Sequence, residues 1–177
     1  MIVMMAGLPG TGKSTLARAL AQRLAGAVLD KDAIRAALFE PGHVEYSPAQ
    51  DDFCQELMLK TAAYLLAKDA GLCVLLDGRT FSRRYQRERV GEFCRQMGTT
   101  RATLECVCGE QTALGRLEEA VARHSHPAAN RTAELYGQIR AAWEPIDGPK
   151  LVIDTDASLD LCVERALRYL VPRTGDV

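Results

Sequence analysis

The feature that most constrains this chain is a glycine-rich segment placed between an apolar run and a helical pattern. The segment is Gly7-Leu8-Pro9-Gly10-Thr11-Gly12-Lys13-Ser14, which fits the pattern G-x-x-x-x-G-K-[ST]. Residues 1–6 are apolar, as in a buried strand, and apolar residues recur at helical spacing after the segment. Strand, glycine loop and helix in this order predict a P-loop at the edge of a parallel sheet.

The predicted loop suits a polyphosphate. Its glycines allow the backbone N–H groups to converge on an anion, and the following helix points its positive end at the same place. Lys13 is expected to reach the β and γ phosphates, the Ser14 hydroxyl to ligate Mg²⁺, and Thr15 to reach the α phosphate. The sequence therefore predicts ATP and Mg²⁺ as cofactors.

The rest of the chain alternates between short apolar runs and helical patterns, which predicts an α/β fold with a parallel sheet covered on both faces. Strands are predicted at Ile2 to Ala6, Ala27 to Leu29, Leu72 to Leu76, Ala102 to Val107 and Leu151 to Ile153. Helices are predicted at Lys13 to Ala25, Lys31 to Phe39, Pro48 to Asp69, Ser82 to Met97, Glu110 to Arg123, Thr132 to Trp143 and Ser158 to Leu170. With no linker or repeat, residues 1–177 are expected to form one domain.

Composition limits which binding partners and which cellular compartment are expected for this chain. The net charge of −1 gives no general basic excess for nucleic acid, although a local groove would suffice. The N-terminal apolar run is too short to cross a membrane and lacks a basic start, so neither a membrane anchor nor a signal peptide is expected. The six cysteines contain no C-x-x-C pair, which predicts reduced thiols in the cytoplasm.

Two acidic positions follow predicted strands. Asp77 ends an apolar strand and is expected to hold Mg²⁺. The alternative is that Asp77 only caps the glycine turn that follows the strand. Gly78 follows it where motor ATPases usually place a water-activating Glu, which favours transfer to an organic acceptor over hydrolysis. Asp32 begins a helix and can take a proton from an acceptor hydroxyl, while Arg35, one turn on, grips an anionic part of the acceptor. Asp30 competes with Asp32 for the role of base, and Asp32 alternatively serves the helix N-terminus.

Basic positions complete the predicted site. Arg116 and Arg123 share a helix face, and a polar loop separates Arg123 from Arg131, which predicts a lid over approximately residues 116–131. Lid arginines would bind the nucleotide and stabilise the transferring group, with solvated surface arginines as the alternative. Arg79, in the turn after Asp77, is expected to contact the acceptor or a phosphate.

Four segments together resemble the small P-loop kinases, which include AAA_33, zeta-toxin-like, polynucleotide-kinase-like, gluconate-kinase-like and adenylylsulfate-kinase-like branches. They are the P-loop with Thr15, Asp32-Ala33-Ile34-Arg35, residues Asp77 to Arg84, and residues His126 to Arg131. The resemblance implies a three-layer fold with a five-stranded parallel sheet in the nucleoside-monophosphate-kinase arrangement and a helical lid. It also implies Asp32 as base, Arg123 as the lid arginine, and an adenine site near Asp154-Thr155-Asp156.

The chain departs from these branches on the acceptor side. Adenylylsulfate kinases carry Asp-Gly-Asp-Asn after the second strand, whereas this chain has Asp30-Lys31-Asp32-Ala33, and residues Glu40 to Asp52 match no branch. We expect residues 40–52 to help form the acceptor pocket. The sequence thus predicts a kinase that phosphorylates a hydroxyl of a small molecule, with a polynucleotide 5′-hydroxyl kinase and an acceptor-free nucleotide switch or ATPase as alternatives.

Overall fold

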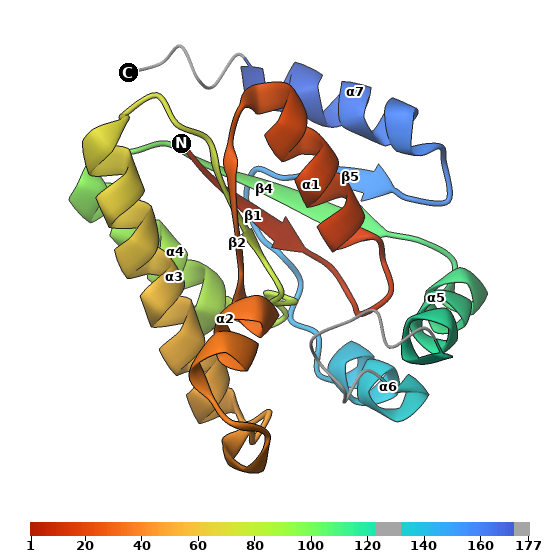
Figure 1. Cartoon of the computed structure of the whole chain (residues 1–177). Helices are drawn as coiled ribbons and strands as arrows, with labels where there is room; N and C mark the ends of the chain where they lie inside the picture. The colour runs from red at the N-terminus through yellow and green to blue at the C-terminus, as the bar shows by residue number, and fades with distance from the viewer. Residues whose placement is uncertain (123–131, 172–177) are drawn as a thin grey trace.

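The computed structural model describes residues 1–122 and 132–171, which form one parallel sheet with helices on both faces (Figure 1). The strands are β1 (Ile2–Ala6), β2 (Ala27–Asp30), β3 (Val74–Asp77), β4 (Arg101–Val107) and β5 (Leu151–Asp154). The α-helices are α1 (Lys13–Leu24), α2 (Lys31–Leu38), α3 (Pro48–Lys68), α4 (Arg84–Met97), α5 (Glu110–Ala122), α6 (Ala133–Ala141) and α7 (Leu159–Leu170). The strand order is β2-β3-β1-β4-β5, with every neighbouring pair parallel. The predicted α/β fold with a five-stranded parallel sheet is confirmed.

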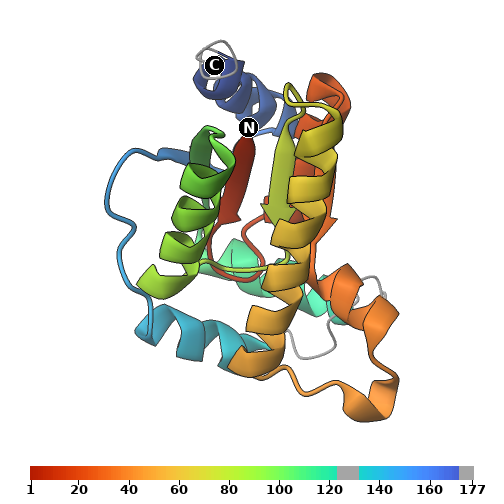
Figure 2. The same ribbon diagram turned by 90° about the vertical axis from the view of Figure 1, so that its left-hand side faces the viewer.

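The central strand β1 explains why the sequence begins with an uninterrupted apolar run. Successive side chains of a strand point to opposite faces. Val3 and Met5 pack with α1 and α7 on one face, whereas Ile2 and Met4 pack with α3 and α4 on the other. Both faces of the strand are therefore buried, and Figure 2 shows the helices standing on either side of the sheet.

Helix ends follow local capping chemistry. Ser47, Thr132 and Ser158 accept hydrogen bonds from backbone N–H groups in the first turns of α3, α6 and α7. Predicted helix and strand limits lie within a few residues of the observed ones, but the sequence patterns did not reveal a short 3₁₀ turn at Pro41–His43.

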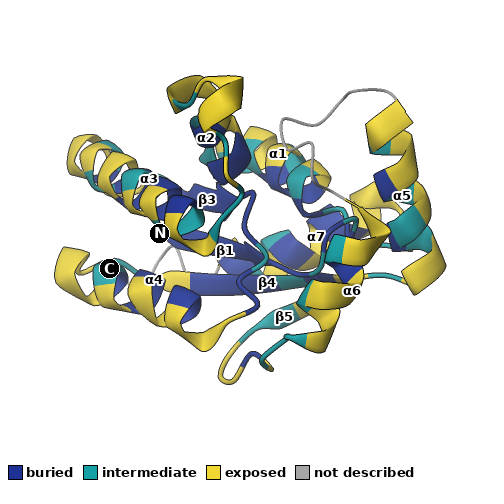
Figure 3. Cartoon of the chain, turned by 90° about the horizontal axis from the view of Figure 1, so that it is seen from below, coloured by how far each residue is buried: buried dark blue, intermediate teal, exposed yellow. Residues whose placement is uncertain are grey.

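The carboxyl ends of β1, β2 and β3 lie at one edge of the sheet. The P-loop follows β1 at this edge. Asp30 and Asp77 are the last residues of β2 and β3, and they pair in register with each other. Seen from this edge, the buried strand ends lie between the more exposed helices α2, α5 and α6 (Figure 3). Ligands of open parallel sheets bind at this kind of edge.

Candidate active site at the carboxyl edge of the sheet

The P-loop has a backbone that only glycine adopts easily. Gly7, Gly10 and Gly12 have φ values of 138°, 79° and 74°. A Cβ atom on Gly7 would lie 2.3 Å from the Cys106 carbonyl oxygen, and one on Gly10 would lie 2.4 Å from the Ala113 carbonyl oxygen. The loop is therefore pressed against the end of β4 and against α5, which fixes the direction of its N–H groups.

The P-loop lysine turns back onto its own loop. Lys13 is the first residue of α1 and only 5% exposed, and its Nζ donates a 2.6 Å hydrogen bond to the Leu8 carbonyl. The Thr11 hydroxyl donates to the same carbonyl over 2.8 Å. Ser14 is partly exposed and Thr15 exposed beside it, at the N-terminus of α1. The helix end, the loop N–H groups and the ammonium together form a site for a polyanion.

Asp77 is a buried carboxylate without a hydrogen-bond partner among the described residues. It is 1% exposed, and neither of its oxygens has a partner. A buried carboxylate in this state is costly unless a cation compensates its charge. Carboxylate and hydroxyl oxygens are ligands that Mg²⁺ prefers, so Asp77 and Ser14 fit the magnesium site of a nucleotide complex.

Asp30 is an N-cap of α2. Its Oδ1 accepts hydrogen bonds from the backbone N–H groups of Asp32, over 2.9 Å, and Ala33, over 3.4 Å. Burial and the neighbouring Asp77 carboxylate raise the pKa of Asp30. Of the two candidates for the catalytic base, Asp30 accepts the hydrogen bonds of the N-terminus of α2. Asp32 instead lines the cleft described below.

Packing explains why glycine follows Asp77. Gly78 has a φ of 78°, and a Cβ atom there would lie 2.5 Å from Oδ1 of Asp30 and 2.8 Å from the backbone nitrogen of Lys31. A glutamate does not fit without moving α2. The missing glutamate thus has a structural cause as well as the mechanistic one that the sequence suggested.

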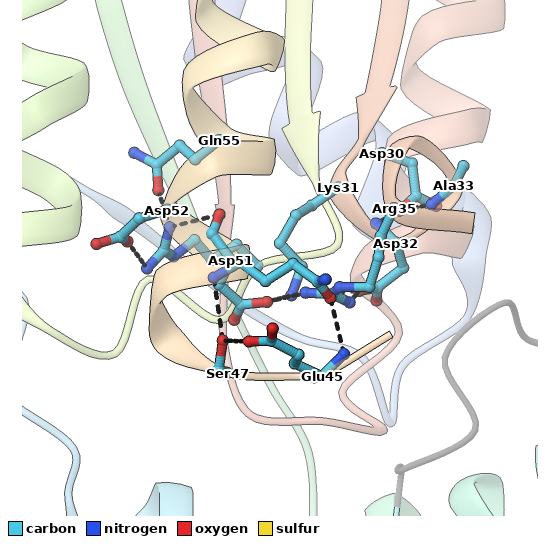
Figure 4. Close-up of polar contacts among 12 residues, drawn as sticks. Asp30, Lys31, Asp32, Ala33, Arg35, Glu45, Ser47, Asp51, Asp52 and Gln55 are labelled. Carbon is cyan, nitrogen blue, oxygen red and sulfur yellow. Dashed lines mark hydrogen bonds and ion pairs between the residues drawn. The ribbon is translucent and has the colours of Figure 1, made fainter. Parts of the chain in front are cut away.

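Four charged side chains from α2 and α3 contact one another, and three of them are buried while Asp51 is partly exposed (Figure 4). They are here called the α2–α3 cluster, defined as Lys31, Asp32, Arg35 and Asp51. Arg35 donates to Asp32 over 2.7 Å and also pairs with Asp51. Lys31 lies 2.7 Å from Oδ1 of Asp51 and 3.2 Å from Oδ1 of Asp32. Burial lowers the pKa of Lys31 to about 8, although the Asp32 carboxylate opposes this shift.

Sequence reasoning did not single out Lys31 or Asp51. Asp51 lies in the first turn of α3, where an acidic residue ordinarily serves the helix N-terminus. Its sequence distance from Arg35 is 16 residues, so only the packing of α3 on α2 brings the two together. The one available signal was the lysine at position 31, where the adenylylsulfate kinase pattern has glycine.

Arg79 is buried, but it is tied to α3 and α4. Its Nη1 donates to the Asp51 carbonyl over 3.2 Å and to Oε1 of Gln55 over 2.6 Å. Its Nη2 donates to Oδ1 of Asp52 over 2.6 Å and to the Tyr85 hydroxyl over 3.2 Å. The predicted contact between Arg79 and an acceptor or phosphate remains a prediction; in the structure its guanidinium holds the start of α3 in place.

One cleft joins the P-loop to the α2–α3 cluster. Pro9 and Lys13 line it on the loop side, and all four cluster residues line it on the other. Its remaining walls come from Tyr46, Gly78, Arg79, Thr80, Leu135 and Ile139. Tyr46 belongs to the segment 40–52, which was expected to help form the acceptor pocket, and Arg35 lies over its ring at 5.1 Å.

A second cleft lies beside Gly12 and Thr15 of the P-loop and the start of α1. Arg116 lines it and donates to Thr155, over 3.0 Å to the hydroxyl and 2.8 Å to the carbonyl. Apolar side chains of Leu16, Ala157 and Leu159 complete the walls. The arrangement suits a flat base adjacent to the phosphates, in the region where the sequence placed the adenine. The predicted lid residues Arg123 and Arg131 lie outside the described residues.

Comparison with known proteins bears on the family and the fold of the chain. A family model described as an AAA domain, AAA_33, matches residues 2–145. No curated protein matches the chain. None of the described helices has the length and apolar character needed to cross a membrane.

Three solved structures illustrate the structural similarity. A proposed kinase from Chloroflexus aurantiacus is 23% identical with a TM-score of 0.75, over 96% of this chain and 97% of that one. The APS kinase of Mycobacterium tuberculosis, in complex with AMPPNP and APS, is 19% identical with a TM-score of 0.69, over 96% of both chains. Chaetomium thermophilum Kti12, in complex with ADP-AlF3, is 13% identical with a TM-score of 0.74, over 99% of this chain and 100% of that one. At these identities the similarity establishes the fold alone. The resemblance to the AAA_33 branch of the small P-loop kinases is confirmed by the family model over residues 2–145.

Proposed function

This chain belongs to the AAA domain family AAA_33, and we propose that it transfers the γ phosphate of ATP to a hydroxyl group of a small molecule. One observation carries the proposal: a single cleft is lined by the P-loop lysine on one side and by a buried carboxylate, Asp32, on the other. Such a cleft places a phosphoryl donor and a hydroxyl acceptor against each other, which is what phosphoryl transfer requires.

On the donor side, residues Gly7 to Thr15 bind the triphosphate through backbone N–H groups, and Lys13 leaves the Leu8 carbonyl for the β and γ phosphates. Arg116 and Thr155 border the base. Bound Mg²⁺ would neutralise charge on the phosphate oxygens, and Ser14 and Asp77 are the residues that would hold it. The lack of a hydrogen-bond partner for either Asp77 oxygen within residues 1–122 and 132–171 supports this assignment.

On the acceptor side, Asp32 receives the proton of the attacking hydroxyl, or orients it, and Arg35 positions Asp32 through their 2.7 Å hydrogen bond. Arg123 stabilises the transferring phosphoryl group, and Arg131 joins Arg116 in binding the nucleotide. All six cysteines are free thiols, which supports a reducing compartment such as the cytoplasm.

The test is ADP release from MgATP with and without acceptors from distinct classes: sugars, nucleosides, adenylylsulfate, aminoglycosides and 5′-hydroxyl oligonucleotides. We expect strong stimulation by one small-molecule class, and loss of that stimulation in Lys13→Ala with an unchanged far-UV spectrum. Wild-type turnover by Lys13→Ala would refute the assignment. Stimulation by oligonucleotides alone, with salt-sensitive binding, would support the polynucleotide kinase instead. Bound ATP with no stimulation by any acceptor would support the nucleotide switch.

A further inference from the structure

We propose that the acceptor is an uncharged polyhydroxy molecule, of the chemical class of sugars, polyols and nucleosides, and carries no phosphate, sulfate or carboxylate group. The inference rests on the proposed phosphotransferase function and identifies the substrate class of the same cleft. It comes from the charges on the acceptor side, which already compensate one another.

Among residues 1–122 and 132–171, the acceptor side contains three cations, and each is paired with a carboxylate. Lys31 and Arg35 both contact Asp32 and Asp51 within the α2–α3 cluster. The third cation, Arg79, pairs with Asp52 over 2.6 Å. Asp52 is also 3.6 Å from Arg89, a half-exposed surface arginine. Lys13, the other cation lining the cleft, belongs to the donor side.

Arg79 has no hydrogen-bonding capacity left at its tip. A guanidinium has four N–H groups on its two η nitrogens. The four hydrogen bonds to Asp51, Gln55, Asp52 and Tyr85 use all of them. The remaining donor, Nε, is buried away from the surface. An anionic acceptor would therefore have to separate Arg79 from α3 before it could be bound there.

The same competition holds for Arg35 and Lys31. An anionic group that binds either cation would repel Asp32 and Asp51, or displace one of them into an uncompensated buried state. Both carboxylates line the cleft together with the cations and contact them directly, so an anion bound to either cation would lie close to a carboxylate. An uncharged hydroxyl meets no such penalty, because it accepts from a cation and donates to a carboxylate at once.

The other groups on the wall suit a polyhydroxy ring. Lys31 and Arg35 contact the same oxygen of Asp51, Oδ1, and the Asp51 side chain is 26% exposed. The other oxygen, Oδ2, is therefore left to accept a hydrogen bond from a ligand hydroxyl. Thr80 adds a hydroxyl. Tyr46, Leu135 and Ile139 provide apolar surface for the C–H groups of a ring.

The reaction is balanced within the cleft. One acceptor hydroxyl attacks the γ phosphorus, the new O–P bond forms, and the bond between the γ phosphorus and the β–γ bridging oxygen breaks. ADP leaves with that bridging oxygen, and the hydroxyl proton passes to Asp32. No oxidant, reductant or further reactant is involved.

The test uses pairs of acceptors that share a skeleton and differ in charge: glucose with gluconate and glucose 6-phosphate, inositol with inositol monophosphate, and adenosine with AMP. The measurements are ADP release and the mass of the product, with MgATP saturating. We expect the uncharged member of at least one pair to be phosphorylated with a kcat/KM at least tenfold above its charged partners.

A charge variant sharpens this test. Asp51→Asn leaves Lys31 and Arg35 facing one carboxylate, so the preference for the uncharged member should fall at least tenfold. Glu56→Gln is the matched control, because it removes one negative charge from an exposed i,i+4 pair on the same helix without touching the cleft. It should retain the wild-type preference.

The outcomes separate the two proposals. Transfer by the wild-type enzyme mainly to a charged member overturns the uncharged acceptor and leaves the phosphotransferase function intact. Absence of transfer to every member, while MgATP is bound, counts against both. An unchanged preference in Asp51→Asn, with transfer intact, refutes the charge argument even if the uncharged acceptor is correct.

Discussion

The donor side of the cleft is made largely of backbone, whereas the acceptor side is made of charged side chains. The P-loop positions its N–H groups through three glycines with positive φ, all within six residues. The α2–α3 cluster instead combines residues from two helices whose contacts span 16 to 20 positions of sequence. A backbone site binds what every ATP shares, while a side-chain site can be altered one residue at a time to suit an acceptor.

The two sides also treat charge differently. Asp77, on the donor side, is left without a partner among the described residues, and the α2–α3 cluster is internally compensated. An uncompensated carboxylate is suited to a cation that arrives with the nucleotide. A compensated cluster is suited to an uncharged ligand.

The largest effect is expected from Asp32→Asn. Loss of a general base typically lowers the rate by about 10²–10⁴-fold, so kcat should fall in this range while the affinity for ATP stays within about twofold of wild type. The measurement is steady-state ADP release combined with calorimetric titration of a nonhydrolysable ATP analogue. Asp160→Asn is the control, since Asp160 is also a first-turn acid of a helix but is exposed on α7. A comparable loss of ATP affinity in Asp32→Asn would place Asp32 on the donor side and break the comparison.

Gly10→Ala should damage the donor side alone. The substitution combines a positive φ with a Cβ atom 2.4 Å from a backbone oxygen, and should destabilise the protein by about 2–3 kcal/mol and weaken ATP binding. Gly148 also has a positive φ, of 89°, but a Cβ atom there would have no atom within 4 Å. The loss of unfolding free energy in Gly148→Ala therefore measures backbone strain without a steric clash. Urea denaturation of both variants gives the difference. Equal losses would show that contact with α5 does not shape the loop.

Asp77→Asn should stabilise the nucleotide-free protein while weakening Mg²⁺-dependent ATP binding. Neutralising a buried carboxylate that lacks partners should raise the free energy of unfolding by about 1–3 kcal/mol. Glu56→Gln, at an exposed position of α3 outside both clefts, should leave both properties nearly unchanged. Thermal unfolding with and without MgATP tests this trade-off, and lower stability of Asp77→Asn without nucleotide would contradict it.

Lys31→Met should show a pH-dependent loss of stability. The folded pKa of Lys31, about 8, lies below the ordinary value of 10.5, so between these values the unfolded chain binds the proton more strongly. The contribution of Lys31 to stability therefore rises with pH through this window. Relative to wild type, the variant should lose about 1–2 kcal/mol more at pH 9.5 than at pH 7. Urea denaturation at both pH values measures it, with Lys60→Met, an exposed lysine, showing no such change.

What the amino-acid sequence reveals also differs between the donor side and the acceptor side of the cleft. The P-loop was found because its function depends on local backbone conformation, and glycine spacing records that conformation directly. The sheet was found because β1 is buried on both faces, which leaves an uninterrupted apolar run in the sequence. The order of the strands came only through the resemblance to the small P-loop kinases.

The acceptor side was accessible only in part. Asp32 and Arg35 are three residues apart on one helix, so their contact follows from helical geometry. Asp51 has no local relation to either residue, and its role depends on how α3 packs against α2. Arg79 was placed near the acceptor because it follows a strand, but its side chain points its donors at α3, which strand position alone does not determine.

The sequence by itself determined the parallel α/β fold, the loop that suits a polyphosphate and the strand ends that carry Asp30 and Asp77, because each depends on local periodicity or on one turn of backbone. Only the tertiary structure decided that the three cations which the described part of the chain places on the acceptor side, Lys31, Arg35 and Arg79, are matched by three carboxylates. Charge compensation is a property of distances between side chains, and these distances exist only once α2, α3 and the turn after β3 are packed together.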